Sequence, residues 1–421
     1  MRIFLELLPH RIEQALNWRG LRVARAGRIR RRTAPAPVLL RAAASPGRPR
    51  LFIDMAVISN HDAKTGIQRV VRALALALLD EAVGTWDIRF VSARRKRRYF
   101  EILWPFPDAA RPVGPEMSAR PGDAFVGLDY SLDAVRRHRR QLGRFRRDGG
   151  ALWFLVHDLL PLDRPEWFSR NTVIRYGAWL GVLAGLADGF FCNSHQTEIE
   201  LRDALGRVHG LERGFRTQIL PMGHAILEAP DVPHGGPVAP RFDTTVPFAL
   251  MVGTLEPRKG HADALAAFEY LWARGAPDRL VLVGRLGWQV DALRDLIVNH
   301  PEYGARLLWF DDVTDAELFA IYDACTGVVI ASLGEGFGLP LIEALGHGKP
   351  VLARDLPVFR MHEGRGVHFF PADASPQVLA DAARTWLDAV QANEIPVVAP
   401  TQDWRVSARI LLAALSAKNL R

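Results

Sequence analysis

The sequence predicts an α/β protein with two domains, each built on a parallel sheet, and three observations lead to this prediction. A chain of 421 residues is too long for one compact core. Short apolar segments alternate with stretches of helical periodicity, as expected where helices connect parallel strands. This alternation stops in a segment rich in proline and glycine, 226–247, and restarts beyond it.

The first domain is expected at 51–225, after a basic leader at 1–50. Its strands are predicted in the apolar runs 51–58, 87–93, 123–129, 151–158 and 188–194. A helix is predicted at 66–82, where apolar residues recur with helical spacing. The apolar run from Tyr176 to Ala187 is shorter than the roughly 18 residues of a membrane span, so it indicates a buried core helix.

The second domain is expected at 248–400, beyond a linker at 226–247. Its strands are predicted at 248–255, 279–285, 305–310, 327–332, 350–355 and 367–370. Its helices are predicted at 260–274, 289–299, 314–325, 339–348 and 375–390. The remaining segment, 401–421, contains an amphipathic helix that is expected to cross back onto the first domain.

Cysteine usage and the N-terminal sequence both favour a cytoplasmic protein. The two cysteines, Cys192 and Cys325, are far apart and form no CxxC pair, which argues against a disulfide framework or a structural zinc site. The first ten residues include Glu6 and Pro9 and lack the extended apolar region of a secretory signal.

Positive charge is concentrated in the first half of the chain, although the net charge is only +8. Residues 1–50 hold 12 arginines and two glutamates, and two further basic runs lie at 94–98 and 136–147. A solvated arginine-rich surface, nucleic-acid binding and attraction to the anionic face of a membrane all remain open as explanations. Nucleic-acid binding is the weakest of these, because no interleaved aromatics or recognisable reader module accompany the charge.

The glycine-rich stretch "ASLGEGFGLPLIEALGHGKP", 331–350, is the segment with the clearest chemical meaning. It follows a predicted strand and opens a helix, as a dinucleotide-binding loop does, but leucines occupy 339 and 341, where the third glycine is required. Pro340 suits the first position of a helix, whose N-terminal amides favour a phosphate. Glu335 and Glu343 flank these amides, and Glu343 suits two vicinal hydroxyls of a ribose, or else merely complements the helix dipole. A nucleotide-sugar fits this combination.

Several motifs together resemble glycosyltransferase family 4. The segment "EGFGLPLIE" (335–343) resembles the signature of that family. "VGTLEPRKGH" (252–261) and "LVGRLGW" (282–288) resemble the nucleotide domain of bacterial mannosyltransferases that build O-antigens and exopolysaccharides. "TGIQRV" (65–70), "HDLLP" (157–161) and "CNSHQTEIEL" (192–201) resemble the acceptor domain. The resemblance covers about residues 51–390, and it implies a retaining enzyme with the GT-B fold, in which two Rossmann-like domains face each other across a cleft.

The resemblance assigns roles to four candidate catalytic residues. Arg258 and Lys259 would stabilise the leaving diphosphate, Glu335 would hold sugar hydroxyls, and His157 would lie beside the donor sugar. The predicted donor-binding set is Gly66, Gly253, Thr254, Arg258, Lys259, Glu335, Gly336, Phe337, Gly338, Leu339 and Glu343. Many members of the family have an arginine at the position of Thr254. The alternatives are a solvated Arg-Lys pair, a structural histidine and an ordinary helix start at Gly66.

The expected function is transfer of a sugar, with GDP-mannose as donor, to a glycan or a lipid-diphosphate-linked acceptor in surface polysaccharide biosynthesis. No cluster of histidine and acidic residues has metal-ligand spacing, so we expect no metal and no cofactor besides the nucleotide-diphospho-sugar substrate. Peripheral contact with the inner membrane is an expected partner interaction, and nucleic acid is not. The alternatives are a non-catalytic nucleotide-sugar-binding or scaffold subunit and, among enzymes, a sugar-nucleotide epimerase or a glycogen-synthase-like polymerase.

Overall fold

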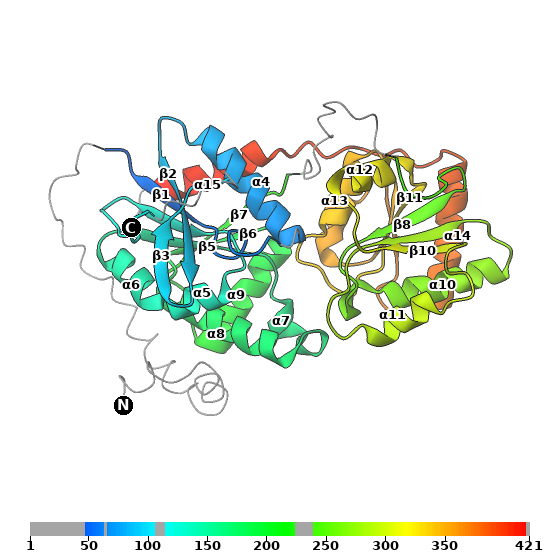
Figure 1. Ribbon diagram of the computed structural model, residues 1–421, viewed down its shortest axis with the longest axis horizontal. Coiled ribbons are helices and arrows are strands. Elements are labelled where there is room, and N and C mark those ends of the chain that lie inside the picture. Colours follow the sequence, from blue (N-terminus) through cyan, green and yellow to red (C-terminus); the bar gives the residue numbers. More distant parts are fainter. Residues whose placement is uncertain (1–46, 63–64, 106–113, 224–238, 418–421) are drawn as a thin grey trace. The chain divides into compact units, whose positions relative to one another are not determined.

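The computed structural model describes residues 47–62, 65–105, 114–223 and 239–417 (Figure 1). Contacts divide the chain into two units: one holds residues up to Met222 together with Trp404–Arg421, and the other holds Gly223–Asp403. Almost all of the basic leader and the greater part of the 226–247 linker lie outside the described residues.

The first unit is built on a seven-stranded sheet with the order β3-β2-β1-β4-β5-β6-β7. All neighbouring strands are parallel except the hairpin pair β2 and β3. The strands are β1 Arg50–Asp54, β2 Asp87–Arg94, β3 Arg97–Glu101, β4 Ala124–Gly127, β5 Ala151–Val156, β6 Gly189–Cys192 and β7 Arg216–Ile219. Its helices are α4 Gly66–Glu81, α5 Leu132–Arg137, α6 Arg139–Arg147, α7 Leu160–Asp163, α8 Arg170–Leu186, α9 His195–His209 and α15 Trp404–Ser416. This is the predicted doubly wound α/β arrangement.

The first strand is shorter than the sequence predicts. The apolar run was expected to continue as a strand to 58, but β1 ends at Asp54 and a turn follows. The carboxylate of Asp54 accepts a hydrogen bond from the amide of Ala56, and that of Asp129 accepts from Val57 and Ile58. Side chains therefore satisfy the backbone amides that a longer strand would have paired with a neighbour.

The second unit is built on a six-stranded, all-parallel sheet with the order β10-β9-β8-β11-β12-β13. The strands are β8 Phe248–Val252, β9 Arg279–Val283, β10 Leu307–Phe310, β11 Gly327–Ile330, β12 Val351–Arg354 and β13 Val367–Phe370. The helices are α10 His261–Ala273, α11 Asp291–Val298, α12 Asp315–Ala324, α13 Leu339–Gly346 and α14 Pro376–Gln391. The strand order is that of a Rossmann-like domain, and it confirms the predicted fold class.

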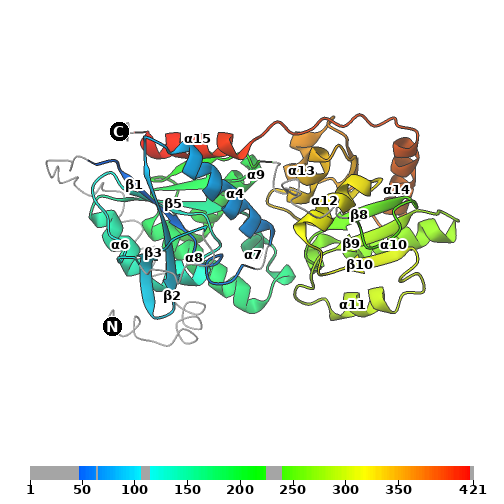
Figure 2. The same cartoon turned by 45° about the horizontal axis from the view of Figure 1, so that its top comes forward.

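Helix α15 packs against α4 in the first unit, as Figures 1 and 2 both show. The hydroxyl of Ser407 donates to the carbonyl of Pro221, and Arg409 forms an ion pair with Glu81 at 3.2 Å. Within the part of the chain that the structure describes, no helix is long and apolar enough to cross a membrane.

Candidate functional site

The strand order reverses direction once in each sheet, and these switch points locate the candidate sites. In open α/β sheets, ligands bind outside the carboxyl ends of the strands at such a point. The switch point lies between β8 and β11 in the second unit, and between β1 and β4 in the first. The segments that follow β8 and β11 contain most of the residues that the sequence selects.

Two loops meet at the switch point of the second unit. The amide of Leu333, after β11, donates to the carbonyl of Arg258, after β8, at 2.7 Å. Gly260 has a φ of +68°, and a Cβ there would lie only 2.1 Å from the carbonyl oxygen of Ala331. Glycine at 260 therefore allows the two loops to approach each other closely.

Arg258, Lys259 and Glu335 form one buried ionic network. Lys259 Nζ lies 2.5 Å from Glu335 Oε1, and Arg258 Nη1 lies 3.1 Å from Glu335 Oε2. Arg258 Nη1 also donates to the carbonyl of Gly334. The side chains are only 15%, 13% and 8% exposed, in the order Arg258, Lys259, Glu335. Three of the four predicted catalytic residues are thus brought into direct contact.

The charge state of Glu335 follows from these contacts. Burial alone would raise the pKa of the carboxyl, but Lys259 and Arg258, together with a hydrogen bond from Ser332, hold it down at about 2. Ser332 Oγ donates to Glu335 Oε1 at 2.7 Å. Glu335 is therefore an anion at neutral pH.

Sequence reasoning missed two members of this network, Ser332 and Glu256. Glu256 is buried, and its Oε1 lies 2.7 Å from Arg258 Nη2, so Arg258 is shared between two carboxylates. Glu256 lies inside the "GTLEPRK" motif, but the motif itself gives no reason to select this acid over a solvated one.

Helix α13 begins at Leu339, directly after Gly338, which has a φ of +84°. Pro340 is therefore the second helical residue and not the first, a correction that leaves it within the first turn. No side-chain cap closes this N-terminus. Gly336 and Phe337 lie in the loop that leads into the helix, with Phe337 buried.

Glu343 lies inside α13 and is buried, with 4% of its surface exposed. Its Oε2 accepts a hydrogen bond from the hydroxyl of Tyr322 on α12 at 2.8 Å. In the predicted contact, a ribose would have to bind a carboxylate that already accepts a hydrogen bond from Tyr322.

Gly253 and Thr254 follow β8 immediately and border the ionic network. A Cβ on Gly253 would lie 3.7 Å from Lys259 Cε, so this glycine lies beside the lysine side chain. A Cβ on Gly287 would lie 3.0 Å from the Thr254 methyl group, which places Thr254 against the loop after β9.

In the first unit, His157 lies just beyond the end of β5 and is 8% exposed. Its Nε2 lies 3.0 Å from the carbonyl oxygen of Leu128, which can only accept, so Nε2 carries the proton. Burial lowers the pKa of His157 to about 4. The imidazole is therefore neutral at pH 7, and Nδ1 is its acceptor atom.

Asp158, which follows His157, and Gly66 of the predicted donor-binding set both have local structural roles in the first unit. Asp158 accepts a hydrogen bond from the amide of Leu160 at 3.2 Å, which is the turn-capping role. Gly66 is the first residue of α4, whose N-cap Thr65 forms a reciprocal capping box with Gln68. This is the geometry of an ordinary helix start.

Two acids at the switch point of the first unit were missed by sequence reasoning. Asp54 ends β1 and Asp129 follows β4, and both are buried. Tyr99 on β3 donates its hydroxyl proton to Asp54 at 2.9 Å. Burial, and then repulsion from Asp129, raise the pKa of Asp54 to about 7. The signal was available, because Asp54 ends an apolar strand and Asp129 lies two residues after another.

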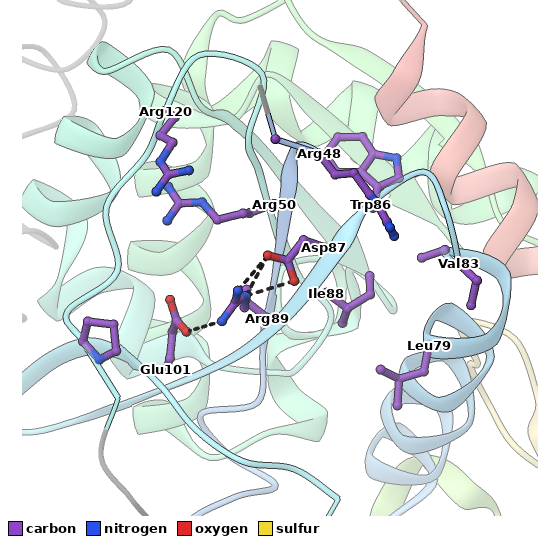
Figure 3. Close-up of a pocket in the computed structure, with 13 residues that line it drawn as sticks. Arg48, Arg50, Leu79, Val83, Trp86, Asp87, Ile88, Arg89, Glu101 and Arg120 are labelled. Atoms are coloured by element: carbon purple, nitrogen blue, oxygen red, sulfur yellow. Dashed lines mark hydrogen bonds and ion pairs between the residues drawn. The ribbon is translucent and has the colours of Figure 1, made fainter. Parts of the chain in front are cut away.

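A cavity of about 790 Å³ in the first unit contains none of the predicted residues (Figure 3). Arg50 and Asp87, the first residues of β1 and β2, line it, so it lies at the amino ends of these strands. Arg89 in this cavity forms ion pairs with Asp87 and Glu101. Ligands of open α/β sheets bind at the opposite edge, and we do not assign this cavity to the candidate site.

Metal-ligating side chains do not gather in the described ranges of the chain. No group of three or more histidine, cysteine, aspartate or glutamate residues there has a geometry that could hold a metal ion.

Comparison with known proteins identifies the family. Residues 238–394 match the family "Glycosyl transferases group 1". The chain is also 32% identical over 380 residues to the serotype-specific mannosyltransferase WbdA of Escherichia coli, which covers 87% of this chain. Residues 238–394 of this chain belong to the group 1 glycosyltransferase family. The resemblance to glycosyltransferase family 4 that the motifs indicated is thereby confirmed.

The chain spans about half the length of the curated relatives that it matches, 45% in the case of WbdA. Among solved structures, it is similar to sucrose-phosphate synthase from Thermosynechococcus elongatus, with a TM-score of 0.56, 17% identity, and coverage of 88% of this chain and 94% of the other. It is also similar to WaaG, a glycosyltransferase involved in lipopolysaccharide biosynthesis, with a TM-score of 0.54, 14% identity, and coverage of 87% and 100%. These similarities confirm the GT-B fold class.

Proposed function

We propose that this chain is a retaining glycosyltransferase that transfers mannose from GDP-mannose to a glycan or lipid-linked acceptor in surface polysaccharide biosynthesis. The observation that carries the proposal is the ionic network of Arg258, Lys259 and Glu335 at the switch point of the second sheet. The choice of mannose rests on the relative that is named a mannosyltransferase.

Lys259 and Arg258 each carry several hydrogen-bond donors, as binding of a diphosphate requires. A lysine ammonium has three donor hydrogens, and Lys259 directs one at Glu335. An arginine has five, and Arg258 uses its two terminal nitrogens toward Glu335, Gly334 and Glu256. Cations aimed at the leaving group stabilise the charge that develops as the glycosidic bond breaks. The phosphate groups would lie between these cations and the N-terminus of α13.

In the proposed reaction, the bond between the anomeric carbon and the β-phosphate oxygen breaks, and the electron pair leaves with the nucleoside diphosphate. The acceptor hydroxyl attacks the anomeric carbon from the same face and gives its proton to the departing phosphate. Glu335 is held by two cations and by Ser332, so we assign it to sugar hydroxyls and not to a covalent intermediate. His157, neutral with Nδ1 as acceptor, would bind a further sugar hydroxyl.

Isothermal titration with GDP, UDP, dTDP and ADP, followed by the corresponding sugar nucleotides, tests the donor. We expect GDP to bind most tightly, and we expect transfer from α-configured GDP-mannose to give an α-linked product by NMR. Preference for another nucleotide would show that GDP-mannose is not the donor. A product with inverted configuration would overturn the retaining mechanism. We also expect full turnover in the presence of a chelator, since helix dipole and basic side chains would hold the diphosphate.

The second hypothesis is a non-catalytic nucleotide-sugar-binding subunit. It predicts that the chain binds the donor but neither transfers the sugar nor hydrolyses the donor. It also predicts that Glu335→Ala changes nothing measurable except binding. The same titration combined with a turnover assay separates the two hypotheses.

A further inference from the structure

Tyr322 on α12 contacts two residues of α13 that face the same side of that helix. Glu343 and the C-cap residue His347 are four residues apart, so their side chains lie one helical turn from each other. The hydroxyl of Tyr322 donates to Glu343 Oε2 at 2.8 Å. The rings of Tyr322 and His347 stack, with centroids 5.0 Å apart and 11° between their planes. One tyrosine side chain is therefore in contact with both residues.

Contacts within the second unit fix the position of Tyr322. Its side chain is fully buried. His347, which stacks on it, is held in turn, because its Nδ1 lies 2.6 Å from Asp323 Oδ1 and the ring of Phe319 meets it edge-on at 4.5 Å. These contacts join α12 to α13, so the hydroxyl of Tyr322 has a defined place beside Glu343.

The hydrogen bond from Tyr322 orients Glu343 and is compatible with a ligand at the same carboxylate. A carboxylate has about four acceptor positions, so one hydroxyl proton does not prevent two further hydroxyls from donating to it. A glutamate side chain has three rotatable bonds, and ordering them opposes binding. Where the side chain is already held on folding, that ordering does not weaken the affinity for the ligand.

The chemistry of the pair indicates more than a partner for a buried hydroxyl. A tyrosine hydroxyl needs a hydrogen-bond partner when it is buried, but a neutral backbone carbonyl is sufficient. In the first unit, the hydroxyl of Tyr176 donates to the carbonyl of Asp158 at 2.6 Å. Tyr322 instead meets a carboxylate that is 4% exposed, and burying a carboxylate costs far more than burying a carbonyl. A role for Glu343 in binding explains why this position has an acid.

We propose that Tyr322 is a positioning residue that holds Glu343 for the vicinal hydroxyls of a ribose. It would thereby make the site select ribonucleoside diphosphates over their deoxy analogues. The inference rests on the proposed function, because it takes the ligand beside α13 to be a nucleotide. Tyr322 itself would not touch the ligand.

Isothermal titration of the full chain with GDP and with 2′,3′-dideoxy-GDP tests the proposal. The unchanged protein should bind GDP at least about tenfold more tightly, since a hydroxyl that donates to a buried carboxylate makes a strong hydrogen bond. In Tyr322→Phe this ratio should fall to about threefold or less, with the affinity for the dideoxy compound within about twofold of its original value. The corresponding uridine pair is titrated in parallel, so that a preference for one base does not affect the comparison.

Tyr270→Phe is the matched control. The hydroxyl of Tyr270 on α10 also forms a hydrogen bond, with Gln377, and it is removed by the same change. This variant should keep the full ratio. A loss of the ratio in Tyr270→Phe equal to that in Tyr322→Phe would overturn the proposal.

Three results in Tyr322→Phe would also overturn the proposal. An unchanged ratio would mean that the tyrosine does not affect ribose binding, and a higher ratio would mean that it competes with the ribose. An equal loss of affinity for both compounds would mean that it acts only through the stability of the unit. Equal binding of both compounds by the unchanged protein would exclude a contact between Glu343 and the ribose. Failure to bind any nucleoside diphosphate would instead overturn the proposed function.

His347→Leu tests the same contact and leaves the tyrosine hydroxyl in place. Loss of the stacked ring should release Tyr322 and lower the ratio by about threefold or more, so the proposal is tested even if Tyr322→Phe does not fold. In both variants KM for the sugar nucleotide should rise while kcat stays within about twofold, because the ribose is bound equally in the ground and transition states. A fall in kcat with unchanged KM would overturn a role in ribose binding.

Discussion

Glu335 is the residue on which the proposed donor site depends most, because it is a buried anion held by two cations. Glu335→Gln keeps the shape but removes the charge, so sugar hydroxyls lose a strong acceptor. We expect turnover to fall by about 100-fold or more. GDP should bind as well as before or more tightly, because Arg258 and Lys259 no longer share their charge with a carboxylate. Steady-state kinetics and isothermal titration measure the two quantities.

A matched control is available in the same unit. Glu302 forms an ion pair with Arg306 at the amino end of β10, away from the switch point. Glu302→Gln should leave both turnover and GDP affinity within about twofold, as is usual for surface ion pairs. Equal losses in the two variants would contradict the assigned role of Glu335.

Asp54 should make the stability of the first unit depend on pH. Its pKa is about 7 in the folded chain, raised by burial and by Asp129, against the ordinary value of 3.8 in the unfolded chain. Between these values the folded state binds the extra proton, so stability falls as pH rises from about 4 to about 7. Asp54→Asn resembles the protonated form and should reduce this loss, by up to about 4 kcal/mol at neutral pH. Urea unfolding at several pH values measures it, and parallel curves for the two proteins would refute it.

At the residue scale, the sequence supports Glu335, Arg258 and Lys259 because they belong to spaced motifs, and these three do meet. Glu256 and Ser332 could not be selected, because an acid or a serine becomes part of a network only through the neighbour that folding brings to it. The spacing of Glu335 and Glu343 along the chain likewise could not predict that Tyr322 donates a hydrogen bond to Glu343.

At the element scale, the start of α13 depends on Gly338. This residue has a φ of +84°, and a Cβ there would lie 2.3 Å from Phe359 Cε1. Gly338→Ala should therefore destabilise the second unit by about 2–4 kcal/mol, from strain and overpacking together. It should also weaken GDP binding, because the helix N-terminus would be displaced. Chemical denaturation and titration test both effects.

Gly348, just after the same helix, provides the control for this substitution. Its φ is +68°, but no atom lies within 4 Å of the position of a Cβ. Gly348→Ala should cost only the conformational penalty, about 1 kcal/mol, and leave GDP affinity unchanged. If the two variants behaved alike, close packing at Gly338 would not be the cause.

Most elements could be predicted from apolar periodicity, and the failures have physical reasons. Strands β3 and β7 have the sequences RRYFE and RTQI, which are too polar or charged to read as buried strands. The residues of β3 are held by pairing with β2 and by Gln141, a contact from a distant segment. The premature end of β1 likewise depends on Asp129, which lies far along the chain.

At the scale of the whole molecule, the alternation of apolar strands and helical stretches restarts after 247, which was enough to predict two α/β units. The order of strands in each sheet could not be predicted from this alternation. Lateral pairing depends on which strands meet in space, and a run of apolar residues records only that a strand is buried. The positions of the switch points therefore required the structure, although the motifs had already selected Arg258, Lys259 and Glu335.

Helix α15, although it lies near the end of the described chain, packs on α4 and stabilises the first unit. Trp404, Ala408 and Leu411 are buried, and the helix packs on α4 of the first unit. Burial of a large apolar side chain contributes roughly 1.5–3 kcal/mol, so removal of 404–421 should destabilise the first unit severely. The second unit, which has its own core, should keep its unfolding transition and its affinity for GDP. Calorimetry and titration of the truncated chain test this, with a chain ending at Ala417 as control. Loss of both transitions together would show that α15 supports the molecule as one cooperative body.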